Sequence, residues 1–256
     1  MASAPLVDTV HQISRELRRV ASLLPNEDPL QPPPGTKNVP SFLFEIRVLL
    51  VLLRALKELG WTITFERRSE HIRFVRSPAP KSTGSFFWIT KDKSQFQITQ
   101  GTQIIDRHGQ PRAPDISLQS GTAGPAPTHG DVLAIWDAKL RGQSGRVTDK
   151  RVSDAEFRSF VMVRAWLAPP LPGNDALSEW PVAFGVCALI SNGRRPTEPE
   201  AVFIEAGVSV VEQFTDENTP TWPTRADHIA GGGQTRMNAQ PSNTLSGAEP
   251  QVLRSV

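Results

Sequence analysis

The sequence predicts an α/β protein in which helices flank a central mixed sheet. Three observations predict this class: a long apolar helix over about 41–59, a series of strand candidates between 61 and 140, and a capped helix at 153–167 that precedes two more strand candidates. This order of elements is typical of a sheet with helices packed on its faces. The chain has 256 residues, 38% of them hydrophobic, which is enough for a sizeable core.

The first predicted element is an amphipathic helix at residues 5–24. Its apolar residues recur at helical spacing, at Leu6, Val10, Ile13, Leu17, Val20 and Leu24. A proline-rich connector follows, because proline cannot continue a helix. This helix is expected either to bind a partner or a second copy of the chain, or simply to pack on the main domain.

The main domain is predicted to begin with the helix at 41–59, which Ser41 can cap at one end and Gly60 at the other. The helix is apolar almost all round, so burial on most sides is expected. The helix at 153–167 opens with a capping box from Ser153 to Glu156. Strands are predicted at 61–68, 71–77, 85–91, 94–101, 113–119, 131–140, 181–190 and 200–207.

The chain is therefore predicted to have four parts. These are an amphipathic N-terminal helix at 1–25, a proline-rich linker at 26–40, the α/β domain at 41–215 and a polar, glycine-rich tail at 224–256. The tail has too few apolar residues to order itself, so disorder is expected there.

Composition excludes several classes of protein. No apolar run is long enough to span a membrane, and the first residues do not resemble a secretion signal, so no membrane contact and a cytoplasmic location are expected. The single Cys187 lies among apolar residues and is expected to be a buried hydrophobic residue rather than a nucleophile. Tyrosine is absent, which excludes a tyrosine nucleophile. A net charge of +2 does not by itself identify a nucleic-acid-binding protein.

The segment "DVLAIWDAKL" at 131–140 carries the most informative pattern. Asp137 and Lys139 are two positions apart, which places both side chains on the same face of a strand. Asp115 follows Pro114 in the preceding strand candidate. If these strands pair as a hairpin, the two carboxylates converge on one hard cation such as Mg²⁺, which would remove their mutual repulsion.

The "PD" at 114–115 and the "DAK" at 137–139, on consecutive strands, resemble the PD-(D/E)xK nuclease superfamily. They look closest to the nuclease subunit of modified-DNA restriction complexes and related bacterial defence nucleases. The resemblance covers about 41–207 and implies a restriction-endonuclease-like core with the first helix as an appendage. It also implies a metal-dependent endonuclease that hydrolyses DNA.

The resemblance assigns roles to individual residues. It implies that Asp115, Asp137 and the backbone carbonyl of Ala138 bind Mg²⁺ or Mn²⁺, and that Lys139 positions or helps to deprotonate the attacking water. Glu45 matches the acidic residue that many members carry on the first core helix, and the resemblance makes it a further catalytic and metal-binding candidate.

Two departures from the family pattern keep alternatives open. The second acidic residue is Asp137 where Glu is commoner, and the loop between the two motif strands is long. A D/E-x-K tripeptide is expected about once by chance in a chain of this composition. The alternatives are therefore a solvated ion pair at a strand end, a non-catalytic DNA-binding or assembly subunit, and an RNA-cleaving nuclease.

A basic loop follows the motif strand, where a phosphate backbone would pass. Its nucleic-acid-binding candidates are Arg141, Arg146, Lys150 and Arg151, and their alternative is a solvated loop. On the next helix, Arg158 and Arg164 are weaker candidates. The segment "SNGRRP" at 191–196 is interpreted as a turn first and as a phosphate contact second. The expected partners are DNA and a separate protein or second copy that docks on residues 5–24.

Overall fold

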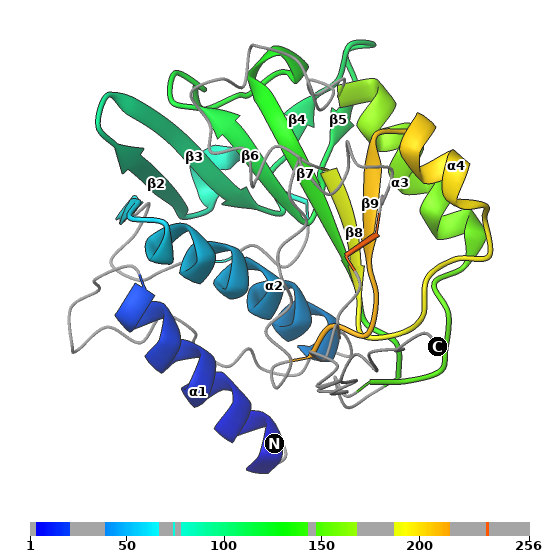
Figure 1. Ribbon diagram of the computed structural model, residues 1–256. Coiled ribbons are helices and arrows are strands. Elements are labelled where there is room, and N and C mark those ends of the chain that lie inside the picture. Colours follow the sequence, from blue (N-terminus) through cyan, green and yellow to red (C-terminus); the bar gives the residue numbers. More distant parts are fainter. Residues whose placement is uncertain are drawn as a thin grey trace, which may run out of the picture.

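The computed structural model describes residues 4–20, 39–66, 74, 78–142, 147–167, 187–215 and 234–235. Within them, a mixed sheet carries strands in the order β1-β2-β3-β6-β7-β8-β9-β10 (Figure 1). Its strands are β1 Thr62–Glu66, β2 Phe86–Lys91, β3 Ser94–Gln100, β6 Ile116–Ser120, β7 Val132–Lys139, β8 Cys187–Ser191, β9 Val208–Val211 and β10 Gln234–Thr235. A separate hairpin pairs β4 Ile104–Ile105 with β5 Pro111–Arg112, and short 3-10 turns lie at Lys81–Thr83 and His129–Asp131.

The sheet changes character at β7. Neighbouring strands from β1 to β7 are antiparallel, as expected for hairpins, whereas β7, β8, β9 and β10 are parallel. A parallel connection needs a crossover segment, and helix α3 Asp154–Leu167 lies between β7 and β8 in the chain. The predicted α/β class with a mixed sheet is therefore confirmed.

Helices cover both sides of the sheet. Helix α2 Val39–Glu58 lies along one side, and α3 and the short α4 Glu200–Glu205 lie on the other, beside β8 and β9 (Figure 1). The predicted burial of α2 is confirmed, since Ile46, Val48, Leu49 and Leu52 are fully buried. The core thus forms between α2 and the sheet, with a second part under α3, where Phe157 contacts Phe203 of α4 edge to face.

Helix α1 Ala4–Val20 packs against α2, so the expectation that the first helix packs on the main domain is confirmed, and a partner for it stays a prediction (Figure 1). Its apolar residues Ile13, Leu17 and Val20 are buried in the common core. At its edge, Arg54 of α2 forms an ion pair of 2.5 Å with Glu16. The face made by these three residues is already covered, so a partner would have to bind α1 elsewhere.

The strand predicted at 200–207 is wrong, because residues 200–205 form helix α4 and the strand follows as β9. Pro199 precedes the first helical residue and Glu200 lies in the first turn, where a negative charge is favoured. Gly207, with a φ of 62°, turns the chain into β9. The short segment "EAVFIE" fits both periods, and the flanking residues decide for the helix.

Other boundaries differ less. Helix α1 is described as far as Val20, and residues 21–24 of the predicted helix lie outside the described residues. Asp115 directly precedes β6 instead of lying within the strand. The candidate at 71–77, apart from residue 74, and the first part of 181–190 lie outside the described residues. Gln234–Thr235 of the predicted tail pair with β9, and the rest of the tail also lies outside.

Cys187 is buried at the start of β8, which confirms the predicted burial, and burial raises the pKa of its thiol. In the part of the chain that the structure describes, no helix combines the length and apolar character that a membrane span requires.

Candidate functional site

The candidate site forms where β6 begins and β7 ends. The two strands pair antiparallel, with Ile116 opposite Trp136, so the predicted hairpin pairing of the motif strands is confirmed. Strand β7 continues to Lys139, past the first residue of β6. Its backbone there no longer has a β6 residue to pair with, and the Asp115 carboxylate takes that place by accepting a hydrogen bond of 2.7 Å from the Ala138 N–H.

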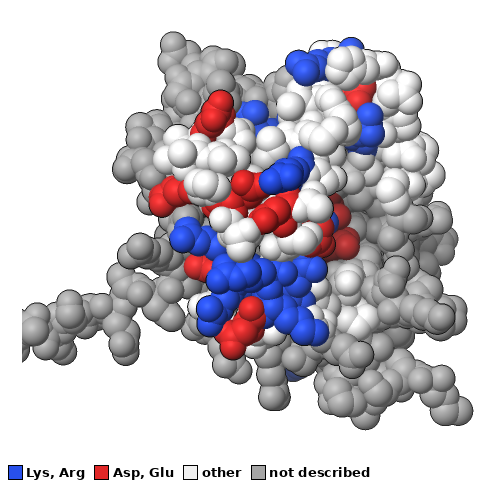
Figure 2. Space-filling model, turned by 90° about the vertical axis from the view of Figure 1, so that its right-hand side faces the viewer, with Lys and Arg blue, Asp and Glu red and all other residues white. Residues whose placement is uncertain are grey.

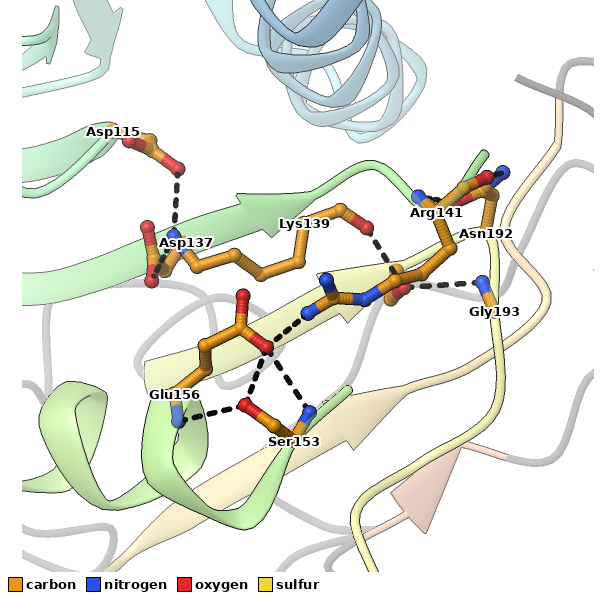
Figure 3. A network of polar contacts seen from close by, with 9 residues as sticks. Asp115, Asp137, Lys139, Arg141, Ser153, Glu156, Asn192 and Gly193 are labelled. Atoms are coloured by element: carbon orange, nitrogen blue, oxygen red, sulfur yellow. Dashed lines mark hydrogen bonds and ion pairs between the residues drawn. The ribbon is translucent and has the colours of Figure 1, made fainter. Parts of the chain in front are cut away.

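Asp115, Asp137 and Lys139 come together at this point (Figure 3). The Lys139 ammonium forms an ion pair of 2.7 Å with Asp137 Oδ2, and its Nζ lies 3.9 Å from Asp115 Oδ2. All three side chains are partly exposed, at 28%, 22% and 16% for Lys139, Asp115 and Asp137. A solvent-borne ion or substrate group can therefore reach them.

Burial and the neighbouring charge of Asp137 raise the pKa of Asp115 well above its usual range, and a hydrogen bond between the two carboxyl groups adds to this. For Lys139, burial would lower the pKa, but the charges of Asp137 and Asp115 outweigh it and raise the pKa. The ammonium therefore stays protonated at neutral pH. The two neighbouring carboxyl groups thus make ionisation of Asp115 unfavourable unless a further positive charge is present.

Glu45 lies near this cluster but is not joined to it directly. It accepts a hydrogen bond of 3.2 Å from Gln100, and no hydrogen bond or ion pair links it to Asp115, Asp137 or Lys139. Burial raises the pKa of Glu45 to about 7, and the charge of Asp137 adds to the shift. By the alternation of side chains, Gln100 shares a face with Trp136, opposite the face of Asp137. Glu45 thus acts on the cluster through its charge.

The donor set fits a magnesium ion better than a fully protein-enclosed metal. Among the described residues, no group of three or more His, Cys, Asp or Glu side chains is arranged to hold a metal. Mg²⁺, however, keeps several waters and is bound through one or two carboxylates. Asp115 and Asp137 supply two. A bound cation would offset the repulsion that contributes to the raised pKa of Asp115. The contact seen at Ala138 uses its N–H, and a role for its carbonyl stays a prediction.

The predicted nucleic-acid-binding residues behave differently from one another. Arg141 does not project freely, because its guanidinium pairs with Glu156 at the start of α3 and its side chain is only 19% exposed. Lys150 and Arg151 are exposed, whereas Arg146 lies outside the described residues. Of the two weaker candidates, Arg164 is buried and donates to the Gly207 carbonyl, and Arg158 is exposed and paired with Glu198.

Sequence reasoning missed several neighbours of the cluster. Glu156 was found only as a capping residue, yet its carboxylate also binds Arg141 (Figure 3). Asn192 holds the chain after β7 by accepting a hydrogen bond from the Arg141 N–H and donating one to the Arg141 carbonyl. Ser191 donates to the Lys139 carbonyl at 2.7 Å. No local pattern could reveal the contacts of Ser191 and Asn192, because they lie about 50 residues from their partners in the chain and meet them through the β7–β8 pairing.

Comparison of the chain with protein-family models, with curated proteins and with solved structures finds no match.

Proposed function

We propose that this protein is a metal-dependent nuclease of the PD-(D/E)xK type, with a restriction-endonuclease-like core, that hydrolyses phosphodiester bonds in DNA. One observation carries the proposal. Asp115, Asp137 and Lys139, which are 22 and two positions apart in sequence, converge at the junction of two paired strands, with the Lys139 ammonium within 4 Å of both carboxylates. A solvated ion pair at a strand end would not require the third group.

The chemistry divides between the carboxylates and the ammonium. Asp115 and Asp137 would hold Mg²⁺ or Mn²⁺, which when bound neutralises charge on the phosphate and activates a water molecule. The Lys139 ammonium, protonated because the aspartates raise its pKa, is suited to donate hydrogen bonds to the attacking water or to a non-bridging oxygen of the phosphate. It positions the reacting groups and is not itself the base.

The Asp115 carboxylate is held in place by the β7 backbone. Its hydrogen bond with the Ala138 N–H fixes one carboxylate oxygen. Asp137 is held from the opposite side by Lys139. Glu45, whose pKa of about 7 allows it to exist in both protonation states at neutral pH, is close enough to modulate the charge of the cluster.

Cleavage of supercoiled plasmid DNA tests the proposal. The wild type is expected to nick the plasmid only with Mg²⁺ or Mn²⁺, and Asp115→Asn and Lys139→Ala are each expected to reduce the rate by 100-fold or more, on the order of the loss of a general acid–base or electrostatic group. Matched controls are Asp92→Asn and Lys93→Ala in the exposed turn between β2 and β3, which are expected to cleave as the wild type does.

Equal cleavage by all five proteins would show that the activity does not come from the site formed by Asp115 and Lys139. A wild type that binds Mg²⁺ in calorimetry through Asp115 but cleaves neither DNA nor RNA would favour a non-catalytic subunit. Cleavage of single-stranded RNA but not of DNA would show that the substrate is RNA, while the assignment of the site residues would stand.

A further inference from the structure

A cluster of four cations lies where two loops cross at the ends of β7 and β8. The loop after β7 contributes Lys150 and Arg151, and the loop after β8 contributes Arg194 and Arg195; together they are called the crossing patch. The Arg194 N–H donates to the Lys150 carbonyl at 2.9 Å, and the Val152 N–H donates to the Arg194 carbonyl at 2.9 Å. Figure 2 shows a dense group of basic side chains on this side of the molecule, with other basic side chains set apart from it.

The crossing is held tightly. A Cβ atom at Gly193 would lie 2.1 Å from the Lys150 carbonyl oxygen and 2.8 Å from the Arg141 side chain, so only glycine permits this approach. The Arg151 guanidinium also donates to the Arg195 carbonyl at 3.3 Å. Cations from segments more than 40 residues apart are thus fixed beside one another, although like charges repel.

Little within the described chain compensates this charge. Arg194 pairs with Asp149, which is itself 87% exposed. The side chains of Lys150 and Arg195 make no hydrogen bond or ion pair with other described residues, and the Arg195 backbone N–H donates to Glu212. Acidic side chains border this basic group, and some lie between basic side chains at its lower edge (Figure 2). Four neighbouring cations, with the carboxylates of Asp149 and Glu212 beside them, leave an excess of positive charge that is suited to bind an extended polyanion.

The crossing patch is connected to the candidate site by short contacts. The Gly193 N–H donates to Ser191 Oγ at 3.0 Å, and Ser191 Oγ donates to the Lys139 carbonyl. Figure 3 shows Gly193, which directly precedes Arg194 of the patch, beside the end of the strand that carries Asp137 and Lys139. In α/β sheets, ligands commonly bind beyond the carboxyl ends of parallel strands, where this patch lies.

We propose that Lys150, Arg151, Arg194 and Arg195 form a docking surface for the phosphate backbone of duplex DNA, which extends the proposed nuclease site beyond the scissile phosphate. This inference rests on the proposed function for the choice of DNA. It adds Arg194 and Arg195 to the binding surface, and it removes Arg141, whose guanidinium is engaged by Glu156. Contacts of this kind fix position and strength of binding without reading sequence.

The test measures binding of a fluorescent 20-base-pair duplex in EDTA, so that neither metal nor cleavage is involved. Lys150→Gln/Arg151→Gln and Arg194→Gln/Arg195→Gln are each expected to weaken binding by about tenfold or more at physiological salt. In a plot of log affinity against log salt, the slope is expected to fall by about 2 for each double variant, one unit per lost phosphate contact. Lys93→Gln/Arg107→Gln, which removes two exposed cations elsewhere, is the control.

Three results would overturn the inference: a wild type that does not bind the duplex, patch variants that match the control in affinity and slope, or patch-dependent binding to phosphatidylserine vesicles with DNA affinity unchanged. A wild type that binds DNA through the patch but never cleaves it would instead contradict the proposed function alone. A wild type that cleaves DNA while its patch variants bind normally would contradict the docking surface alone.

Discussion

The two faces of strands β3, β6 and β7 differ in chemistry although both are buried. The face toward α2 carries Ile98, Leu118, Ala134 and Trp136, all without exposed surface. The opposite face of β3 and β6 carries Gln97, Thr99, Ser117 and Gln119, each at most 1% exposed, and ends at the candidate site with Asp115, Asp137 and Lys139. In β3 and β6 the alternation of side chains places apolar residues mainly on one face and polar residues on the other. Both faces are nevertheless buried.

Hydrogen bonds replace solvent on the polar face. The hydroxyls of Thr99 and Ser117 lie 2.7 Å apart, and the Gln119 amide donates to both. The Lys81 ammonium donates to the side-chain oxygens of Gln97 and Gln119. Apolar contacts on one face are non-directional and stabilise the fold, whereas this network is directional and fixes β6 two to four residues from Asp115. We infer that the apolar face contributes most of the stability, whereas the polar face positions β6 and the site residues next to it.

The largest expected effect on stability comes from the apolar face. Trp136→Ala is expected to lower the free energy of unfolding by about 4 kcal/mol, because the indole is fully buried and its removal leaves a cavity. Urea denaturation followed by circular dichroism measures this change. Trp88→Ala, at a half-buried position of β2, is the control and is expected to cost less. An equal loss at both positions would contradict the assignment of stability to the α2-facing core.

The hub of the polar network is expected to come second. Lys81→Met retains much of the apolar side chain but leaves the oxygens of Gln97, Gln119 and Ala123 without this donor, at a cost of about 2 kcal/mol. Lys93→Met, at an exposed position, is expected to change stability by less than about 0.5 kcal/mol in the same urea titration. If Lys81→Met proves neutral or stabilising, the network does not contribute to folding.

The pair of Glu45 and Gln100 is the polar exception on the α2-facing side, and it is expected to show in the pH dependence of stability. The folded-state pKa of Glu45, about 7, lies above its ordinary value of 4.5, so the folded protein binds the proton more tightly than the unfolded chain. This contribution is complete below pH 4.5 and is lost as the pH rises to about 7, at a cost of about 1–3 kcal/mol.

Glu45→Gln is expected to flatten that part of the profile. The free energy of unfolding, measured by urea titration at pH 4.5 and 7.5, is expected to differ less in the variant than in the wild type. The charge of Glu45 also raises the pKa of Asp115, so the variant is expected to lose this share of the Asp115 shift as well, which flattens the profile in the same direction. Identical pH profiles of the two proteins would mean that folding does not raise the pKa of Glu45.

The smallest effect on stability is expected at the polar end of β7. Asp137→Asn loses the ion pair with Lys139 and at the same time relieves the repulsion of Asp115, so the free energy of unfolding is expected to change by less than about 1 kcal/mol. Calorimetric titration is nevertheless expected to lose Mg²⁺ binding. A variant that is strongly destabilised but still binds Mg²⁺ would assign Asp137 to the fold instead of the site.

The sequence by itself determined the elements that have long or well-marked patterns. Helix α2, with its apolar run, and α3, with its capping box, were predicted within two residues, as were β2, β3 and β7. The spacing of Asp137 and Lys139 placed them on one face, and the ion pair between them follows from strand geometry alone. These are local properties, since period, capping and alternation depend only on near neighbours in the chain.

Tertiary structure decided everything that depends on distant segments. Helix α4 packs against β9, a contact that the sequence of "EAVFIE" does not show. The β6–β7 register brought Asp115 to the Ala138 N–H, and α2 packing brought Glu45 to Gln100. The β7–β8 pairing brought Arg194 to Lys150. Such contacts arise from strand register and helix placement, which are set by the whole core and are therefore not written in any single stretch of sequence.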